Sequence, residues 1–67
     1  MAKQYLRDKR GRILGWIDNS ITGKLYIRDW MGRICGWYDI RTNLTRDKQG
    51  RIVGRGNLLT TLLPPRP

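Results

Sequence analysis

The stretch Tyr26-Ile-Arg-Asp-Trp-Met-Gly-Arg-Ile-Cys-Gly-Trp-Tyr-Asp39 decides the fold, because two further versions of it occur in the same chain. An earlier version, YLRDKRGRILGWID, spans residues 5–18, and a later one, LTRDKQGRIVGRGN, spans residues 44–57. All three share the frame Tyr/Leu-x-Arg-Asp-x-x-Gly-Arg-Ile-x-Gly. A unit repeated three times in 67 residues predicts a fold made of similar substructures placed side by side.

Each copy contains the residues of a tight β-hairpin turn. Aspartate suits the first position of a type I turn, where its carboxylate accepts backbone N–H groups, and the glycine three residues later suits the left-handed conformation that follows. The turns are predicted at 8–11, 29–32 and 47–50. A three-residue loop sets each aspartate opposite the next arginine, which predicts the cross-strand ion pairs Asp8–Arg12, Asp29–Arg33 and Asp47–Arg51.

Away from the turns, we expect the strands to continue in simple register. In the first hairpin Arg7 then faces Ile13, Leu6 faces Leu14, and Tyr5 covers the bare backbone of Gly15. Alternation along the strands divides the side chains between two faces. The predicted core face collects Leu6, Leu14, Trp16, Leu25, Ile27, Cys35, Trp37, Thr45 and Val53. The other face, either half covered or used for binding, collects Tyr5, Arg7, Ile13, Ile17, Tyr26, Arg28, Ile34, Tyr38, Leu44, Arg46 and Ile52.

The fold class predicted is therefore all-β, in a single domain over residues 1–67. Six antiparallel strands form a meander of three hairpins, at 4–18, 24–39 and 43–57, in a strongly coiled or barrel-like sheet. In the tail, 58–67, four leucines share one helical face between Asn57, a suitable N-cap, and the pair Pro64-Pro65. A short C-terminal helix is expected to cap the sheet; the alternative is that its leucines dock a partner.

Composition argues against an enzyme. Histidine is absent, so the commonest general base and zinc ligand is missing, and the single cysteine, Cys35, has no partner for an internal disulfide. All five carboxylates are aspartates at repeat positions, and no phosphate-binding glycine loop occurs. We expect no catalytic residues, no metal, no cofactor and no small-molecule substrate. No apolar run approaches the roughly 20 residues of a membrane span, so we expect no membrane contact and a cytoplasmic location.

The charge points instead to a polyanionic partner. Fourteen Lys and Arg residues against five Asp give a net charge of +9, which favours binding of DNA or RNA through arginine–phosphate contacts assisted by aromatic side chains. Trp30 stands at a turn position that holds lysine in the other two copies. The predicted contact residues are Arg7, Arg28, Trp30, Arg46, Lys48, Arg51 and Arg55. The alternative is a protein–protein interaction module, or a homo-oligomeric adaptor or inhibitor, that uses the leucine-rich tail and the arginine/aliphatic face. The edge strands of such a protein would allow a homodimer by strand pairing.

The motif Arg-Asp-x-x-Gly-Arg-Ile-x-Gly resembles the tyrosine/aspartate (YD) class of β-hairpin repeats. Over residues 5–63 the chain is similar to small bacterial and mobile-element proteins that carry repeated hairpins of this kind. The resemblance implies the hairpin fold and attaches no activity to it. No functional residue is carried over from it.

Overall fold

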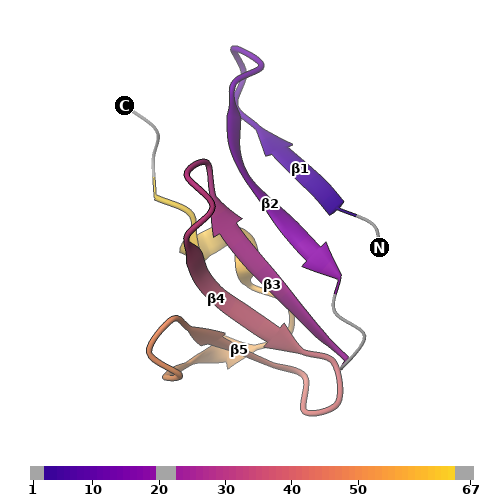
Figure 1. The fold of residues 1–67 in the computed structure, drawn as a ribbon. Coiled ribbons are helices and arrows are strands. Elements are labelled where there is room, and N and C mark those ends of the chain that lie inside the picture. Colours follow the sequence, from indigo (N-terminus) through magenta and orange to yellow (C-terminus); the bar gives the residue numbers. More distant parts are fainter. Residues whose placement is uncertain (1–2, 20–22, 65–67) are drawn as a thin grey trace.

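The fold is a six-stranded antiparallel sheet with one short helical turn behind it (Figure 1). A computed structural model describes residues 3–19 and 23–64; the middle of the link at 20–22 and the tail from Pro65 lie outside these ranges. The elements are β1 (Lys3–Arg7), β2 (Ile13–Asn19), β3 (Lys24–Asp29), β4 (Ile34–Asp39), β5 (Leu44–Asp47), β6 (Ile52–Arg55) and the 3-10 helix η1 (Leu59–Leu62). Within the described residues, no helix is long and apolar enough to span a bilayer.

The sheet keeps the strands in chain order, β1 to β6, so the predicted meander of three hairpins is confirmed. The sheet is open, with β1 and β6 as its two edges, so the suggested barrel-like closure is wrong. The expected C-terminal helix is reduced to the single 3-10 turn of η1. Figure 1 shows the strand direction turning strongly from β2 to β5, as a right-handed twist between neighbouring strands requires.

The three turns form as their residues predict. In the first, the N–H of Gly11 donates to the carbonyl of Asp8 at 2.9 Å, and Gly11 adopts a φ of +82°. The Asp8 carboxylate accepts the N–H groups of Arg10 and Arg12 and pairs with the Arg12 guanidinium at 2.9 Å. An equivalent pair joins Arg33 to Asp29 at 3.0 Å.

The third predicted ion pair is wrong. The backbone N–H groups of Gln49 and Arg51 donate to the carboxylate of Asp47, as in the other turns. Within the described part of the chain, however, no salt bridge joins Asp47 to the Arg51 guanidinium. The backbone contacts are therefore common to all three turns, and the ion pair is not.

The register departs from the prediction one residue beyond each turn. Arg7 pairs with Ile13 as expected, but Leu6 pairs with Gly15 and Tyr5 with Trp16, which leaves Leu14 as an extra residue in a β-bulge. The same shift occurs in the other hairpins, where Cys35 and Val53 are the extra residues. A one-residue slip moves every later side chain to the opposite face of the sheet.

Four side chains consequently lie on the face opposite to the predicted one. Trp16 and Trp37 pair with Arg28 and Arg46, and so belong to the arginine face and not to the core. Conversely, Ile17 pairs with the fully buried Ile27, and Tyr38 with the fully buried Thr45. These four assignments were wrong because the bulge was not part of the predicted register.

The core lies between the sheet and the C-terminal segment, whose leucines cover the strand glycines. A methyl group added at Gly54 would lie 2.7 Å from Leu58, one at Gly36 would lie 2.5 Å from Leu62, and one at Gly15 would lie 2.8 Å from Leu63. At Gly15, leucine thus covers the bare backbone where tyrosine was expected. Leu59 is fully buried and Leu58, Leu62 and Leu63 are half-buried, so the leucines cap the sheet, and the alternative that they dock a partner stays a prediction.

Thr45 connects β5 to this capping segment. It takes the repeat position that Leu6 and Ile27 hold in the earlier hairpins, and its polar side chain is fully buried there. Its hydroxyl donates to the carbonyl of Gly56 at 2.6 Å and accepts the N–H of Leu58 at 3.0 Å. A hydroxyl suits this position because it satisfies two backbone groups where the chain leaves the sheet and turns behind it.

Candidate nucleic-acid interface

The face of the sheet turned away from η1, called the open face below, carries two equivalent rows of side chains. Residues directly opposite one another on neighbouring strands share a face. The first row crosses β1 to β4 and the second crosses β3 to β6. They consist of Tyr5, Trp16, Arg28 and Ile34, and of Tyr26, Trp37, Arg46 and Ile52. Each row therefore takes its aromatic pair from one hairpin and its arginine from the next.

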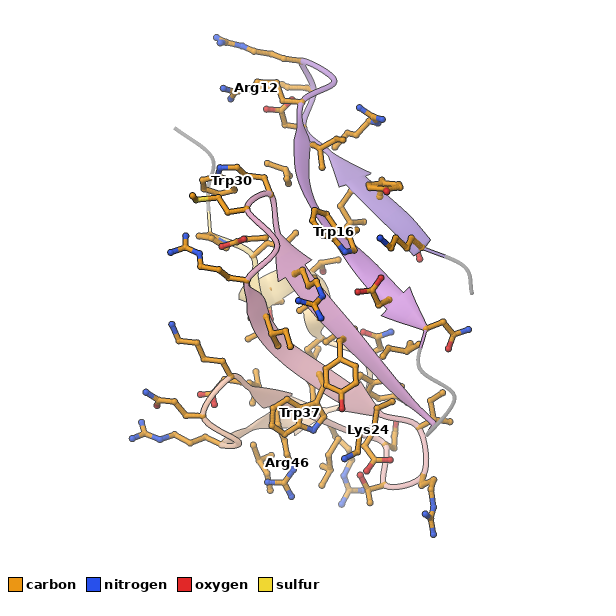
Figure 2. All side chains as sticks on the ribbon, viewed as in Figure 1. Arg12, Trp16, Lys24, Trp30, Trp37 and Arg46 are labelled. Carbon is orange, nitrogen blue, oxygen red and sulfur yellow. The ribbon has the colours of Figure 1, made fainter. Side chains whose placement is uncertain are left out.

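Further cations surround these rows. Figure 2 shows Trp16, Lys24, Trp37 and Arg46 in front of the sheet, with η1 behind it. Strand alternation and pairing add more groups to the same face. The additional cations there are Lys3, Arg7, Lys24 and Arg55, and the carboxylates are Asp18 and Asp39. Positive charge is in excess on the open face.

The repeat arginines are held in place by the turns beside them. Nη1 of Arg7 donates to the carbonyl of Gly11 at 2.9 Å, and Nη1 of Arg28 and of Arg46 donates to Gly32 and Gly50, each at 2.8 Å. Arg28 also pairs with Asp18 at 2.9 Å.

These contacts occupy only part of each guanidinium, which carries five N–H donors. Hydrogen bonds within the protein use one nitrogen of Arg7 and of Arg46 and two nitrogens of Arg28. A side chain ordered in this way loses less conformational entropy when it binds a ligand. The arrangement suits the recognition of an oxyanion.

The aromatic side chains are packed between hairpins as well as exposed. The ring centroids of Tyr5 and Trp16 lie 6.0 Å apart, those of Tyr26 and Trp37 lie 6.2 Å apart, and both pairs are tilted. Lys3 Nζ lies 5.6 Å from the Trp16 ring centroid, a cation–π contact. The rings also reach the turns of the following hairpins. A methyl group added at Gly32, for example, would lie 3.8 Å from Cη2 of Trp16. Each tryptophan thus joins two hairpins and contributes its remaining surface to the open face.

The structure divides the predicted contact residues between two regions. Arg28 and Arg46 lie in the two rows, and Arg7 and Arg55 lie on the same open face. Trp30 stands at the tip of the β3–β4 turn and is half-buried (Figure 2). Lys48 and Arg51 belong to the β5–β6 turn. Four of the seven are therefore gathered on one surface, and three lie on turns.

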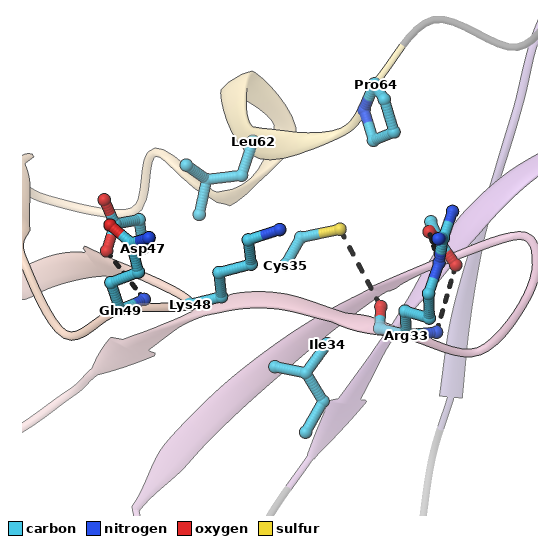
Figure 3. Close-up of a pocket in the computed structure, with 9 residues that line it drawn as sticks. Arg33, Ile34, Cys35, Asp47, Lys48, Gln49, Leu62 and Pro64 are labelled. Atoms are coloured by element: carbon cyan, nitrogen blue, oxygen red, sulfur yellow. Dashed lines mark hydrogen bonds and ion pairs between the residues drawn. The ribbon is translucent and has the colours of Figure 1, made fainter.

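Lys48 also lines a groove of about 430 Å³ between two turns and the C-terminal segment. Figure 3 shows Cys35 and Lys48 on the side of Leu62, with Ile34 pointing the other way. The described residues contain no group of three side chains able to hold a metal ion.

The titratable groups of this groove serve the fold. Burial raises the pKa of Asp29, but the N–H groups of Arg33 and Met31 and the Arg33 guanidinium outweigh it, so the pKa lies below its ordinary value. Burial, followed by the negative charge of Asp29, raises the pKa of the Cys35 thiol. The Asp29 carboxylate is fully engaged by its own turn, so neither group suggests chemistry on a ligand.

Sequence reasoning did not include Trp16, Trp37, Lys3 or Lys24 among the contact residues. The two tryptophans were assigned to the core because the bulge was not recognised. The signal was available, since a glycine inside a strand pattern marks a bulge or a close approach of another segment. Comparisons with protein-family models, curated protein sequences and solved structures give no match, so the resemblance to YD repeats stays a prediction.

Proposed function

We propose that the protein is a small, non-enzymatic nucleic-acid-binding protein that takes the phosphate backbone of DNA or RNA on its open face. The observation that carries the proposal is the pair of equivalent rows, each of which sets an ordered arginine beside an aromatic pair. The net charge of +9 supports it, because a large positive charge on a small domain attracts polyanions.

The spacing of the repeat arginines suits an extended, regularly charged ligand. Arg7, Arg28 and Arg46 stand on β1, β3 and β5, and are thus two strands apart from one to the next. Ordinary strand spacing puts successive positions about 10 Å apart across the sheet. A chain that crosses the strands meets one arginine per hairpin, with a tryptophan next to Arg28 and to Arg46 for contact with a base.

Binding of this kind depends steeply on salt. Each phosphate neutralised on a single strand contributes about 0.7 to the slope of log K against log salt. Four contacts, from Arg7, Arg28, Arg46 and Arg55, therefore predict a slope of about −3. The contacts are to backbone phosphate, so unrelated sequences should bind with similar affinity.

The test is fluorescence anisotropy with labelled single- and double-stranded oligonucleotides of unrelated sequence over a salt series. One variant replaces Arg7, Arg28 and Arg46 by Gln. Its matched control replaces three exposed turn cations, Lys9, Arg10 and Arg41, by Gln and so has the same net charge. We expect at least a tenfold loss of affinity and a shallower salt slope for the open-face variant, and a much smaller change for the control. Equal losses in both variants would remove the open face from the proposal.

A protein partner is the second candidate, and one observation favours it. The isoleucines that end the two rows, Ile34 and Ile52, are 39% and 56% exposed. An interface centred on them would be apolar and insensitive to salt. If the wild-type protein shows no salt-sensitive binding to any oligonucleotide at low ionic strength, the nucleic-acid proposal fails and this candidate takes its place.

A further inference from the structure

The hairpins are joined to one another by a junction that occurs twice with the same register. At β2–β3, Gly15 faces Asp29 and Trp16 faces Arg28. At β4–β5, Gly36 faces Asp47 and Trp37 faces Arg46. In both junctions the tryptophan ring extends to the turn glycine of the following hairpin, Gly32 or Gly50. A tryptophan on the last strand of one hairpin and an arginine on the first strand of the next thus define the junction.

Each edge of the sheet carries one half of such a junction. β1 offers Arg7 at the position that Arg28 and Arg46 hold in the internal junctions. β6 offers Gly54 and then Arg55, where the earlier hairpins have glycine and tryptophan. If a second copy placed its β1 along β6 in the internal register, Arg55 would face the Arg7 of that copy.

We propose that Arg55 ends the array and prevents the chain from pairing head to tail with another copy of itself. Like charges directly opposite on neighbouring strands destabilise a sheet, and the ring that fills an internal junction is missing. The two edges are otherwise matched in backbone and register, so β6 could pair with β1 of another copy. Natural sheets prevent such edge-to-edge pairing with charged residues and short edge strands. β6 has only four residues, and beyond it Gly56 turns the chain away with a φ of +84°. This inference does not depend on nucleic-acid binding.

A charge-reversal cycle tests the proposal. Arg55→Glu and Arg7→Glu each replace the repulsion by an attraction across the same junction, and the double variant restores a like-charge pair. Sedimentation velocity at low salt, over a concentration series up to about millimolar, measures self-association. We expect the wild type and the double variant to stay monomeric, and each single variant to associate at least tenfold more strongly.

The double variant separates the junction from simple net charge. It carries the lowest net charge of the four proteins, so charge loss alone would make it the most associated. Single variants that sediment like the wild type at every concentration, or a double variant that associates most, would overturn the proposal. Circular dichroism verifies that each variant is folded.

A second measurement uses the missing tryptophan directly. Arg55→Trp rebuilds the internal junction, whereas Arg51→Trp adds the same apolar surface on an exposed turn outside it. We expect concentration-dependent assembly of Arg55→Trp alone, weakened when Arg7→Glu removes its junction partner. Equal assembly of the two tryptophan variants would mean that added hydrophobic surface, and not the junction register, drives association, and would overturn the proposal.

Discussion

Replacing Gly36 by alanine tests how closely the C-terminal segment packs on the sheet. The added methyl would lie 2.5 Å from Cδ1 of Leu62 and 3.1 Å from Cα of Asp47, and would overlap the backbone oxygen of Arg46. Two of these three atoms belong to the backbone of β5 and cannot rotate away. The equivalent methyl at Gly54 meets only Cδ1 of Leu58, at 2.7 Å, which is the mobile end of a side chain. The two glycines are therefore a matched pair.

The free energies of unfolding of the two variants should differ clearly. Overpacking costs about 1–3 kcal/mol, and the lost freedom of glycine in the unfolded chain returns about 0.4–1 kcal/mol. Gly36→Ala has the full cost, because the β4–β5 pair must open to admit the methyl, so its net loss is about 2 kcal/mol. For Gly54→Ala a small packing cost and a similar gain from the lost freedom of the unfolded chain nearly cancel. The free energy of unfolding should therefore change by no more than about 0.5 kcal/mol.

Thermal unfolding followed by tryptophan fluorescence and circular dichroism measures the difference. A domain of this size loses about 4–8 °C in Tm per kcal/mol, so Gly36→Ala should melt about 8–16 °C below Gly54→Ala. The variant Leu62→Ala in the Gly36→Ala background should recover only part of the loss, because the overlap with the Arg46 oxygen remains. Equal melting temperatures for the two alanine variants would refute the close packing described here.

Three further expectations concern titration and buried polar groups. The pKa values of Asp8 and Asp29 lie below 3.8 in the folded chain, so their stabilisation is present above that pH and is lost as the pH falls below it; urea unfolding from pH 6 to 2 should show this, less steeply for Asp29→Asn. Thr45→Val leaves two backbone groups unsatisfied and should lower the free energy of unfolding by about 1–3 kcal/mol in urea, and no loss would mean that the hydroxyl contacts are dispensable. The raised pKa of Cys35 should make iodoacetamide alkylation at pH 8 slower in the folded protein than in urea, and equal rates would contradict its burial.

The turns were predictable because all their requirements lie within five residues. The aspartate supplies the carboxylate that accepts two backbone N–H groups, and glycine three positions later supplies the positive φ, which is +87° at Gly32. Neither requirement depends on the rest of the chain. The order of the strands followed as well, since consecutive hairpins with short links pair with their neighbours.

The register was not predictable by alternation alone, because alternation places no extra residue before the strand glycine. Gly15 is packed against Leu63, nearly fifty positions later, and the extra residue Leu14 precedes it. Of the candidate site, Arg7, Arg28 and Arg46 were assigned to the correct face because they precede the turns, where no bulge intervenes. Trp16, which follows a bulge, was assigned to the wrong one.

The bulge links the two faces of the sheet. A strand glycine leaves room for a leucine on the core face, and the extra residue before it turns the next side chain, Trp37 in the second hairpin, toward the open face beside Arg46. Without that residue the indole would point to the core side, into the space that Leu62 occupies. The glycine that a C-terminal leucine covers and the tryptophan that stands beside the arginine are thus adjacent residues of one bulged strand. The core and the surface proposed to bind nucleic acid therefore share one local register.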